Sequence, residues 1–212
     1  MTDDGDMDDR TTGANVAFYQ VPLMCPAAPG IGCGSRSKPI LLDLESMPII
    51  EEAWLDRQGK VLAIVWTAGT AEAARANAVV AVRNAHNLSA EELTGGAQDA
   101  ALQSFRSGRD WYRGAEVDRL SEEEAGIIAD RLMLRVTAKA PTISPKAEWL
   151  RSIMTNIIRS CLVKSRDPFS KPCRETFADD LIAAVGDHLG AAEIDALQEA
   201  TKAGFRPLAG ER

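Results

Sequence analysis

The stretch that decides the fold is residues 16–67. It reads VAFYQVPLMCPAAPGIGCGSR over 16–36 and SKPILLDLESMPIIEEAWLDRQGKVLAIVWT over 37–67. Residues 16–23 are rich in strand formers, and a Gly- and Pro-rich loop follows them. Ser37 is predicted to cap a short helix that has Pro39 in its first turn. The runs 49–56 and 60–67 then predict two strands of a hairpin, because a glycine lies between them.

Helices are expected over most of the chain beyond this stretch. An Ala-rich helix is predicted from residue 71 to about 85, capped by Thr70. Capping-box patterns at Ser89 and Ser121, each followed three residues later by Glu, predict helix starts there. The clearest helix begins at Ser144-Pro145 and carries one apolar stripe. Two further helices are expected at about 173–188 and 190–204. The order of elements predicts an α+β protein with a mainly helical C-terminal region.

The N-terminal segment resembles the heavy-metal-associated domain of copper chaperones and metal-pumping ATPases. That family has a Gly-Met-x-Cys-x-x-Cys motif, and here residues 30–36 read GIGCGSR. The apolar residues and proline expected after the motif match Ile40, Leu44, Met47 and Pro48. The resemblance covers about 16–93 and implies a ferredoxin-like βαββα(β) unit with a metal site at Cys33.

Two departures from the family motif bear on that metal site. Arg36 occupies the position of the second metal cysteine, and Ile49 replaces the glycine after the proline. A two-coordinate thiolate site therefore cannot form from residues 33–36 alone. For residues 86–93, a fourth strand and a helix start both stay open.

Cys25 and Cys33 flank the Gly- and Pro-rich loop, with seven residues between them. Such a loop can bring two sulfurs within about 4 Å, as a shared metal or a disulfide requires. Cys33 is expected just before a helix N-terminus. The helix dipole and the nearby cations Arg36 and Lys38 should then favour its thiolate. A turn with two incidental cysteines is the alternative.

The other two cysteines lie far downstream, at 161 and 173. Cys161 falls on the apolar stripe, which is typical of a small core residue, and Cys173 is at the start of a predicted helix. The window 145–176 contains seven Lys and Arg against three Asp and Glu, so its net charge is +4. This positive charge can lower the pKa of a nearby thiol or attract an anionic partner. The alternative is an ordinary solvated helix face. A further hypothesis is that all four cysteines bind one Zn²⁺ or one iron–sulfur cluster, although their spacing matches no short metal-ligand motif.

Composition limits the protein class. The chain has 212 residues, a net charge of −7 and 45% hydrophobic residues. More than half of that charge falls in the first ten residues, so residues 1–14 are expected to be an acidic disordered tail. The domains are predicted as 15–93, ferredoxin-like, and 94–212, helical. No apolar run suits a membrane span or a secretory signal, so no membrane insertion and a cytoplasmic location are expected. With two histidines and no phosphate-loop or dinucleotide motif, the sequence supports no particular catalytic class.

Three functions follow from these patterns. The first is metal handling or sensing, with Cys25, Cys33, Cys161 and Cys173 as candidate ligands for Zn²⁺, Cu(I) or Hg(II), or for an iron–sulfur cluster. The second is a thiol redox sensor or oxidoreductase that cycles Cys25 and Cys33 between dithiol and disulfide. The third is an adaptor that binds a protein partner through its helical region, or binds nucleic acid through the +4 window.

Overall fold

The computed structural model describes residues 15–164 and 171–211, without the side chains of 171–175. The expected acidic tail, 1–14, lies outside the described residues. The described chain divides into two compact units. The first, the sheet unit, comprises residues 15–22 and 39–116. The second, the helical unit, comprises residues 23–38 and 117–211. Helices and an antiparallel sheet together confirm the α+β class.

The sheet unit contains all five strands described, in the spatial order β4-β1-β3-β2-β5. Every pair of neighbouring strands is antiparallel. The predicted first strand, the hairpin and the Ala-rich helix are confirmed within a few residues. The elements of this unit are β1 (Val16–Gln20), α1 (Gly34–Glu45, of which residues 39–45 belong here), β2 (Ile50–Asp56), β3 (Val61–Trp66), α2 (Glu72–His86), β4 (Glu91–Glu92), α3 (Gly96–Arg106) and β5 (Trp111–Tyr112).

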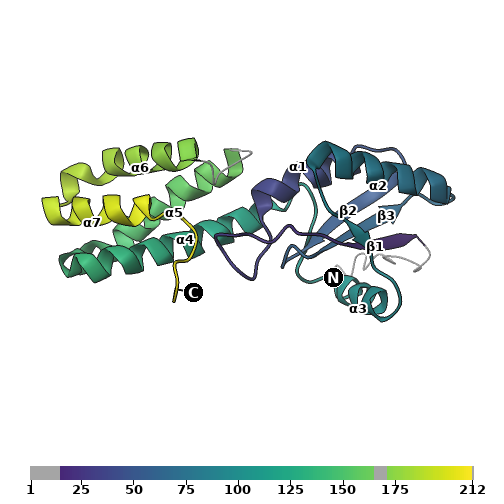
Figure 1. Cartoon of the computed structure of the whole chain (residues 1–212), viewed down its shortest axis with the longest axis horizontal. Helices are drawn as coiled ribbons and strands as arrows, with labels where there is room; N and C mark the ends of the chain where they lie inside the picture. The colour runs from purple at the N-terminus through teal and green to yellow at the C-terminus, as the bar shows by residue number, and fades with distance from the viewer. Residues whose placement is uncertain (1–14, 165–170, 212) are drawn as a thin grey trace, which may run out of the picture. The chain divides into compact units, whose positions relative to one another are not determined.

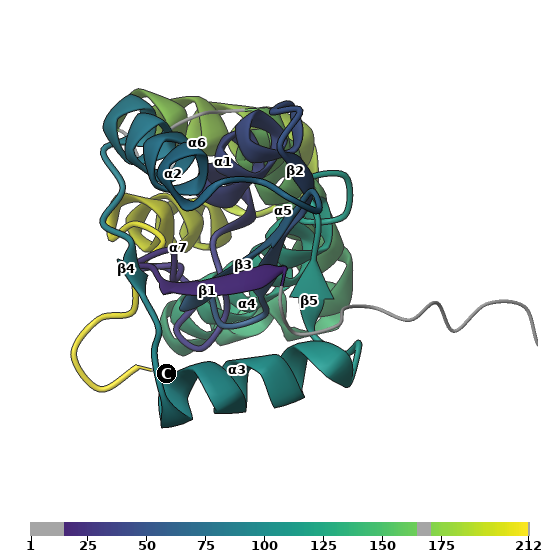
Figure 2. The same cartoon turned by 90° about the vertical axis from the view of Figure 1, so that its right-hand side faces the viewer.

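Both faces of this sheet are covered by helices. Figures 1 and 2 show α2 and the C-terminal part of α1 on one face and α3 on the other. On the α3 side, the ring of Phe105 contacts the rings of Phe18, Trp54 and Trp111 edge to face, at centroid distances of 5.1–5.9 Å. All four rings are buried, so an aromatic cluster fixes α3 to the sheet.

The helical unit has four long helices. They are α4 (Asp118–Lys139), α5 (Ala147–Lys164), α6 (Lys171–Val185) and α7 (Ala191–Lys202), with short 3₁₀ turns η1 (Pro141–Lys146) and η2 (Gly186–His188). Helix α4 packs against α5 and α7, and α6 packs against α5 and α7. The predicted stripe of α5 is confirmed, because Leu150, Met154, Ile158 and Leu162 are buried. The loop 23–33 joins this core through Cys25, Ala27, Ala28, Ile31 and Cys33.

Local predictions of helix starts were wrong at Ser37, Thr70, Ser89 and Ser121. The N-cap residue of α2 is Ala71, without a side-chain cap, and the hydroxyl of Thr70 donates to the carbonyl of Thr67. Helix α1 begins at Gly34, so Ser37 lies inside it and donates its hydroxyl to the carbonyl of Cys33. For residues 86–93 the strand alternative is confirmed, because Glu91–Glu92 form β4 and pair with β1, so the capping-box pattern at Ser89 starts no helix. Ser121 lies within α4 and its hydroxyl is buried, so it caps nothing. Tertiary packing overrides the capping patterns at these sites.

The division into units differs from the predicted boundary after residue 93. Helix α3 and strand β5 belong to the sheet unit, because β5 pairs with β2 and α3 packs on the sheet. Conversely, the cysteine loop belongs to the helical unit. Among the described residues, no helix combines the length and apolar character that a membrane span requires.

Candidate metal centre

The loop that carries Cys25 and Cys33 folds back on itself as a short antiparallel pair. Met24 lies opposite Gly32 in a β-bridge. The amide of Cys25 donates to the carbonyl of Ile31, and the amide of Cys33 donates to that of Leu23, both at 2.8 Å. Residues 25 and 33 are thus diagonal neighbours on one face of the pair, which brings their side chains together. Gly30, with φ of +95°, makes the turn between the two arms.

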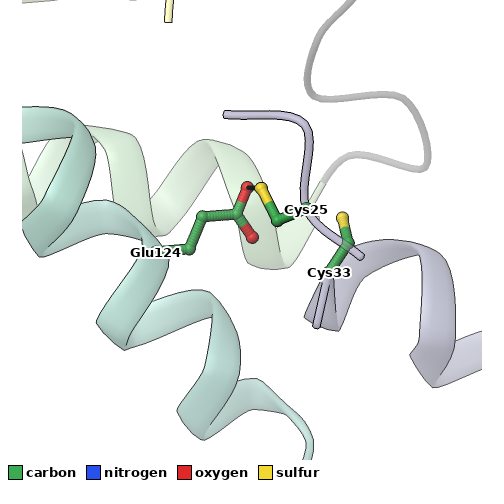
Figure 3. A group of neighbouring side chains, drawn as sticks. All are labelled: Cys25, Cys33 and Glu124. Carbon is green, nitrogen blue, oxygen red and sulfur yellow. Dashed lines mark hydrogen bonds between the residues drawn. The ribbon is translucent and has the colours of Figure 1, made fainter. Parts of the chain in front are cut away.

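A third residue, Glu124 of α4, completes the group. The sulfurs of Cys25 and Cys33 and a carboxylate oxygen of Glu124 all lie within 4.8 Å of one another. The thiol of Cys25 donates to Oε1 of Glu124 at 3.0 Å, the contact drawn as a dashed line in Figure 3. The three residues are at most 2% exposed. Two segments separated by 99 positions in the sequence therefore meet in a buried cluster of sulfur and oxygen.

The surroundings of Cys33 stabilise a thiolate. Cys33 directly precedes α1, so its sulfur lies at the positive end of that helix. A hydrogen bond with Cys25 lowers the pKa of Cys33 to about 6, although burial acts in the opposite direction. The hydroxyl of Ser35 and the backbone N–H and charge of Arg36 lower this pKa further. The Ser35 hydroxyl lies 3.3 Å from the sulfur. Cys33 is therefore the first of the two thiols to ionise.

The sulfur of Cys25 accepts two backbone hydrogen bonds. The amides of Ala27 and Ala28 each lie 3.2 Å from it. Interaction with Cys33, burial and the neighbouring Glu124 raise the pKa of the Cys25 thiol. The sulfur thus has N–H donors suited to a thiolate, yet retains its proton while no cation neutralises the cluster.

Glu124 is a buried carboxyl with one oxygen unused. Among the described residues, its Oε2 finds no hydrogen-bond partner, and neither does the buried hydroxyl of Ser121. Burial, followed by the negative charge of Cys33, raises the pKa of Glu124 to about 8, while the hydrogen bond from Cys25 lowers it. An unpaired buried carboxylate is costly, so the site is incomplete without a cation or a proton.

Gly34 permits the close approach of the loop to α4. A Cβ at this position would lie 2.3 Å from Oγ of Ser121 and 2.7 Å from the carbonyl oxygen of Val117. Any side chain here would push the start of α1 away from α4. The glycine therefore keeps Cys33 within reach of Glu124.

The predicted site residues have different places in the structure. Cys25 and Cys33 are brought together as free thiols. Cys161 is half-buried on α5 and is disulfide-bonded, and the side chain of Cys173 lies outside the described ones. Arg36 is exposed and acts on Cys33 through its backbone N–H and its charge. Lys38, the other predicted thiol-activating cation, pairs with Asp118.

Glu124 was missed at the sequence level because it was taken for the second residue of a capping box. A signal was nevertheless present. Leu120, Glu124, Ile128 and Leu132 follow one another at intervals of four residues, so the glutamate interrupts an apolar stripe of α4. An ionisable residue on a core stripe needs a partner, and that partner is the cysteine loop.

Two thiols and a carboxyl in this arrangement can act in two ways. After losing their protons they offer two sulfurs and one oxygen to a metal ion. Alternatively, the two thiols can form a disulfide upon oxidation. Comparison of the chain with protein-family models, with curated proteins and with solved structures finds no match.

Proposed function

We propose that this protein binds a divalent metal ion through Cys25, Cys33 and Glu124, and serves in metal handling or sensing. The observation that carries the proposal is the convergence of three buried ligand atoms within 4.8 Å. The unpartnered Oε2 of Glu124 supports it, because a buried carboxylate oxygen without a donor is what a cation would satisfy.

The spacing suits a small tetrahedral ion. With Zn–S bonds of about 2.3 Å and Zn–O bonds of about 2.1 Å, tetrahedral ligand atoms lie about 3.6–3.8 Å apart. The Cys25 sulfur and the Glu124 oxygen are 3.0 Å apart, and no pair in the group exceeds 4.8 Å. Shifts of about an ångström would therefore close the site, with a fourth position left for water or substrate.

The donor set favours Zn²⁺ among the candidate ions. Carboxylate oxygen is a poor ligand for soft Cu(I) or Hg(II), whereas Zn²⁺ accepts sulfur and oxygen together. An iron–sulfur cluster commonly takes four thiolates, and the described part of the chain gathers two. A divalent ion would also neutralise much of the charge that now keeps protons on Cys25 and Glu124.

The resemblance to heavy-metal-associated domains gives this proposal a structural setting. The order β4-β1-β3-β2, with α1 after β1 and α2 after β3, is compatible with a ferredoxin-like arrangement. Within it, Cys33 has the position of that family's first metal cysteine. In place of a cysteine at Arg36, the proposed site uses Cys25 from the Gly- and Pro-rich loop and Glu124 from α4. This difference suits a retained ion more than a rapidly exchanged one, since all three ligands are buried.

Elemental analysis of protein purified under reducing conditions, without chelator, tests the proposal. We expect about one zinc per chain in the wild type. The variants Cys33→Ser and Glu124→Gln should bind zinc more weakly, the first by at least about 100-fold, because loss of a ligand exceeds the 10–100-fold cost of losing an outer partner. Glu122→Gln, exposed on the same helix, is the matched control and should behave as the wild type. Absence of metal from the wild type, or equal metal in Cys33→Ser, would refute the proposal.

A thiol redox function is the second candidate, because Cys25 and Cys33 are neighbouring free thiols and Cys33 has a lowered pKa. Mild peroxide treatment followed by mass spectrometry distinguishes it. A loss of two hydrogens from the peptide containing both cysteines would favour it, and persistent free thiols would exclude it. An adaptor role through the helical region stays a prediction.

A further inference from the structure

Arg131 is a buried arginine beside the proposed metal site. It lies on α4, two turns after Glu124, and is 3% exposed. Its Nη1 donates to the carbonyl of Ala27 at 2.6 Å and to that of Phe205 at 2.7 Å. A guanidinium is seldom buried without such partners, so its position is set by the loop and by the C-terminal segment.

The contact with Ala27 acts on the sulfur of Cys25 through a single peptide group. The carbonyl of Ala27 and the amide of Ala28 belong to the same planar unit. That amide is one of the two that point at the Cys25 sulfur, at 3.2 Å. Arg131 therefore fixes the plane of this peptide and polarises its N–H toward the sulfur.

Charge balance points to the same residue. Two thiolates and a carboxylate around a divalent ion retain one negative charge, and Arg131 supplies one positive charge close by. Burial and the neighbouring Arg135 lower the pKa of Arg131, whereas the negative charges of Glu211 and Cys25 raise it. The guanidinium thus interacts electrostatically with the ligand that it helps to orient.

We propose that Arg131 is a positioning residue of the metal site, which holds the Ala27–Ala28 peptide so that Cys25 is presented as a ligand. The proposal rests on the metal-binding function proposed above. Arg131 acts through the peptide and the sulfur, as outer partners of metal ligands do in other sites.

Arg135, one helical turn further on, provides a matched control. It is also mostly buried, and it donates to the carbonyl of Ala200 at the end of α7 and, in the C-terminal segment, to the carbonyls of Gly204 and Arg206 and to the carboxylate of Glu211. Replacing either arginine by lysine weakens the attachment of that segment. The Arg131 substitution additionally releases the Ala27–Ala28 peptide.

The test compares zinc affinity, by competition with a chelator, and the thiolate-to-cobalt charge-transfer absorption of the Co²⁺-loaded protein. We expect Arg131→Lys to weaken zinc binding about 10–100-fold and to reduce the cobalt–thiolate band. Arg135→Lys should keep wild-type affinity and spectrum even where it lowers thermal stability. Equal losses in both variants, or wild-type metal binding by Arg131→Lys, would overturn the role of Arg131. Absence of metal from the wild type would overturn the proposed function as well, so the two failures are distinguishable.

A measurement on the wild type covers the case in which Arg131→Lys does not fold. The Ala28 amide hydrogen belongs to the peptide that Arg131 holds and points at the Cys25 sulfur. It should exchange with solvent more slowly in zinc-loaded than in chelator-treated protein. Equal exchange rates in the two forms would overturn the proposal.

Discussion

The interiors of the sheet unit and the helical unit differ in kind. The sheet unit is closed by apolar and aromatic side chains, with Phe18, Trp54, Phe105 and Trp111 at its centre on one face. Among the described residues, every buried Ser, Thr, Glu and Arg belongs to the helical unit: Ser35, Ser37, Ser121, Glu124, Arg131, Glu193 and Thr201. Burial of such groups costs free energy unless partners or a ligand satisfy them. The contrast supports the proposed placing of the metal site in the helical unit and its cysteine loop, while the sheet unit is held by packing.

The largest expected effect of a single change lies in the sheet unit. Phe105→Ala removes the ring that contacts three other aromatic rings, and should lower the free energy of unfolding by about 3–5 kcal/mol. Zinc content measured beside a urea unfolding curve should stay at the wild-type value while the protein is folded. Loss of zinc from the folded variant would show that metal binding depends on the aromatic core of the sheet unit, contrary to this comparison.

A pair of helix-starting glycines sharpens the contrast. Gly34→Ala places a methyl group against Ser121 and the carbonyl of Val117, and should destabilise the protein by about 1–3 kcal/mol and weaken zinc binding. Gly96→Ala, at the start of α3, meets nothing within 4 Å and should be neutral or stabilise by up to about 1 kcal/mol. Thermal unfolding and zinc affinity of both variants check this. Similar effects of the two substitutions would show that stability and zinc binding do not depend on the close approach of the loop to α4.

A pH-dependent effect is expected at Glu124. Its pKa in the metal-free folded protein is about 8, above its ordinary value of 4.5, so folding retains a proton between these values. Its contribution to stability is therefore fully present below about pH 4.5 and is lost as pH rises through about 8. Glu124→Gln removes this titration, so between pH 5 and 9 the wild type should lose about 4 kcal/mol relative to the variant.

Urea unfolding with chelator over that pH range measures the difference. Ionisation of Cys33 has the opposite sign, since its pKa is lowered to about 6, but it is common to both proteins to first order. If the free energies of unfolding of wild type and variant changed in parallel with pH, Glu124 would not be a buried carboxyl that holds a proton.

Sequence patterns predict the local elements well and the site in part. Strand-forming runs, the glycine between 49–56 and 60–67, and the stripe of α5 correspond to elements of the structure. The loop composition also predicts that Cys25 and Cys33 approach each other, because only short-range chain geometry is involved. The helix starts predicted at Ser37 and Ser89 fail because tertiary contacts decide them.

The contribution of Glu124 to the proposed site cannot be predicted from local sequence patterns. It is 99 residues from Cys25, and their contact depends on the way α4 packs beneath the loop. No short motif encodes that packing, and Ser121–Glu124 has the same local pattern as an ordinary capping box. The close approach at Gly34, which makes the contact feasible, is likewise visible only in three dimensions.

X-ray absorption at the zinc edge of the purified protein tests the central claim most directly. We predict two sulfur ligands at about 2.3 Å together with oxygen or nitrogen ligands at about 2.0–2.2 Å, one of which is lost or replaced in Glu124→Gln. A zinc ion with no sulfur ligand, or with four, would contradict the site formed by Cys25, Cys33 and Glu124.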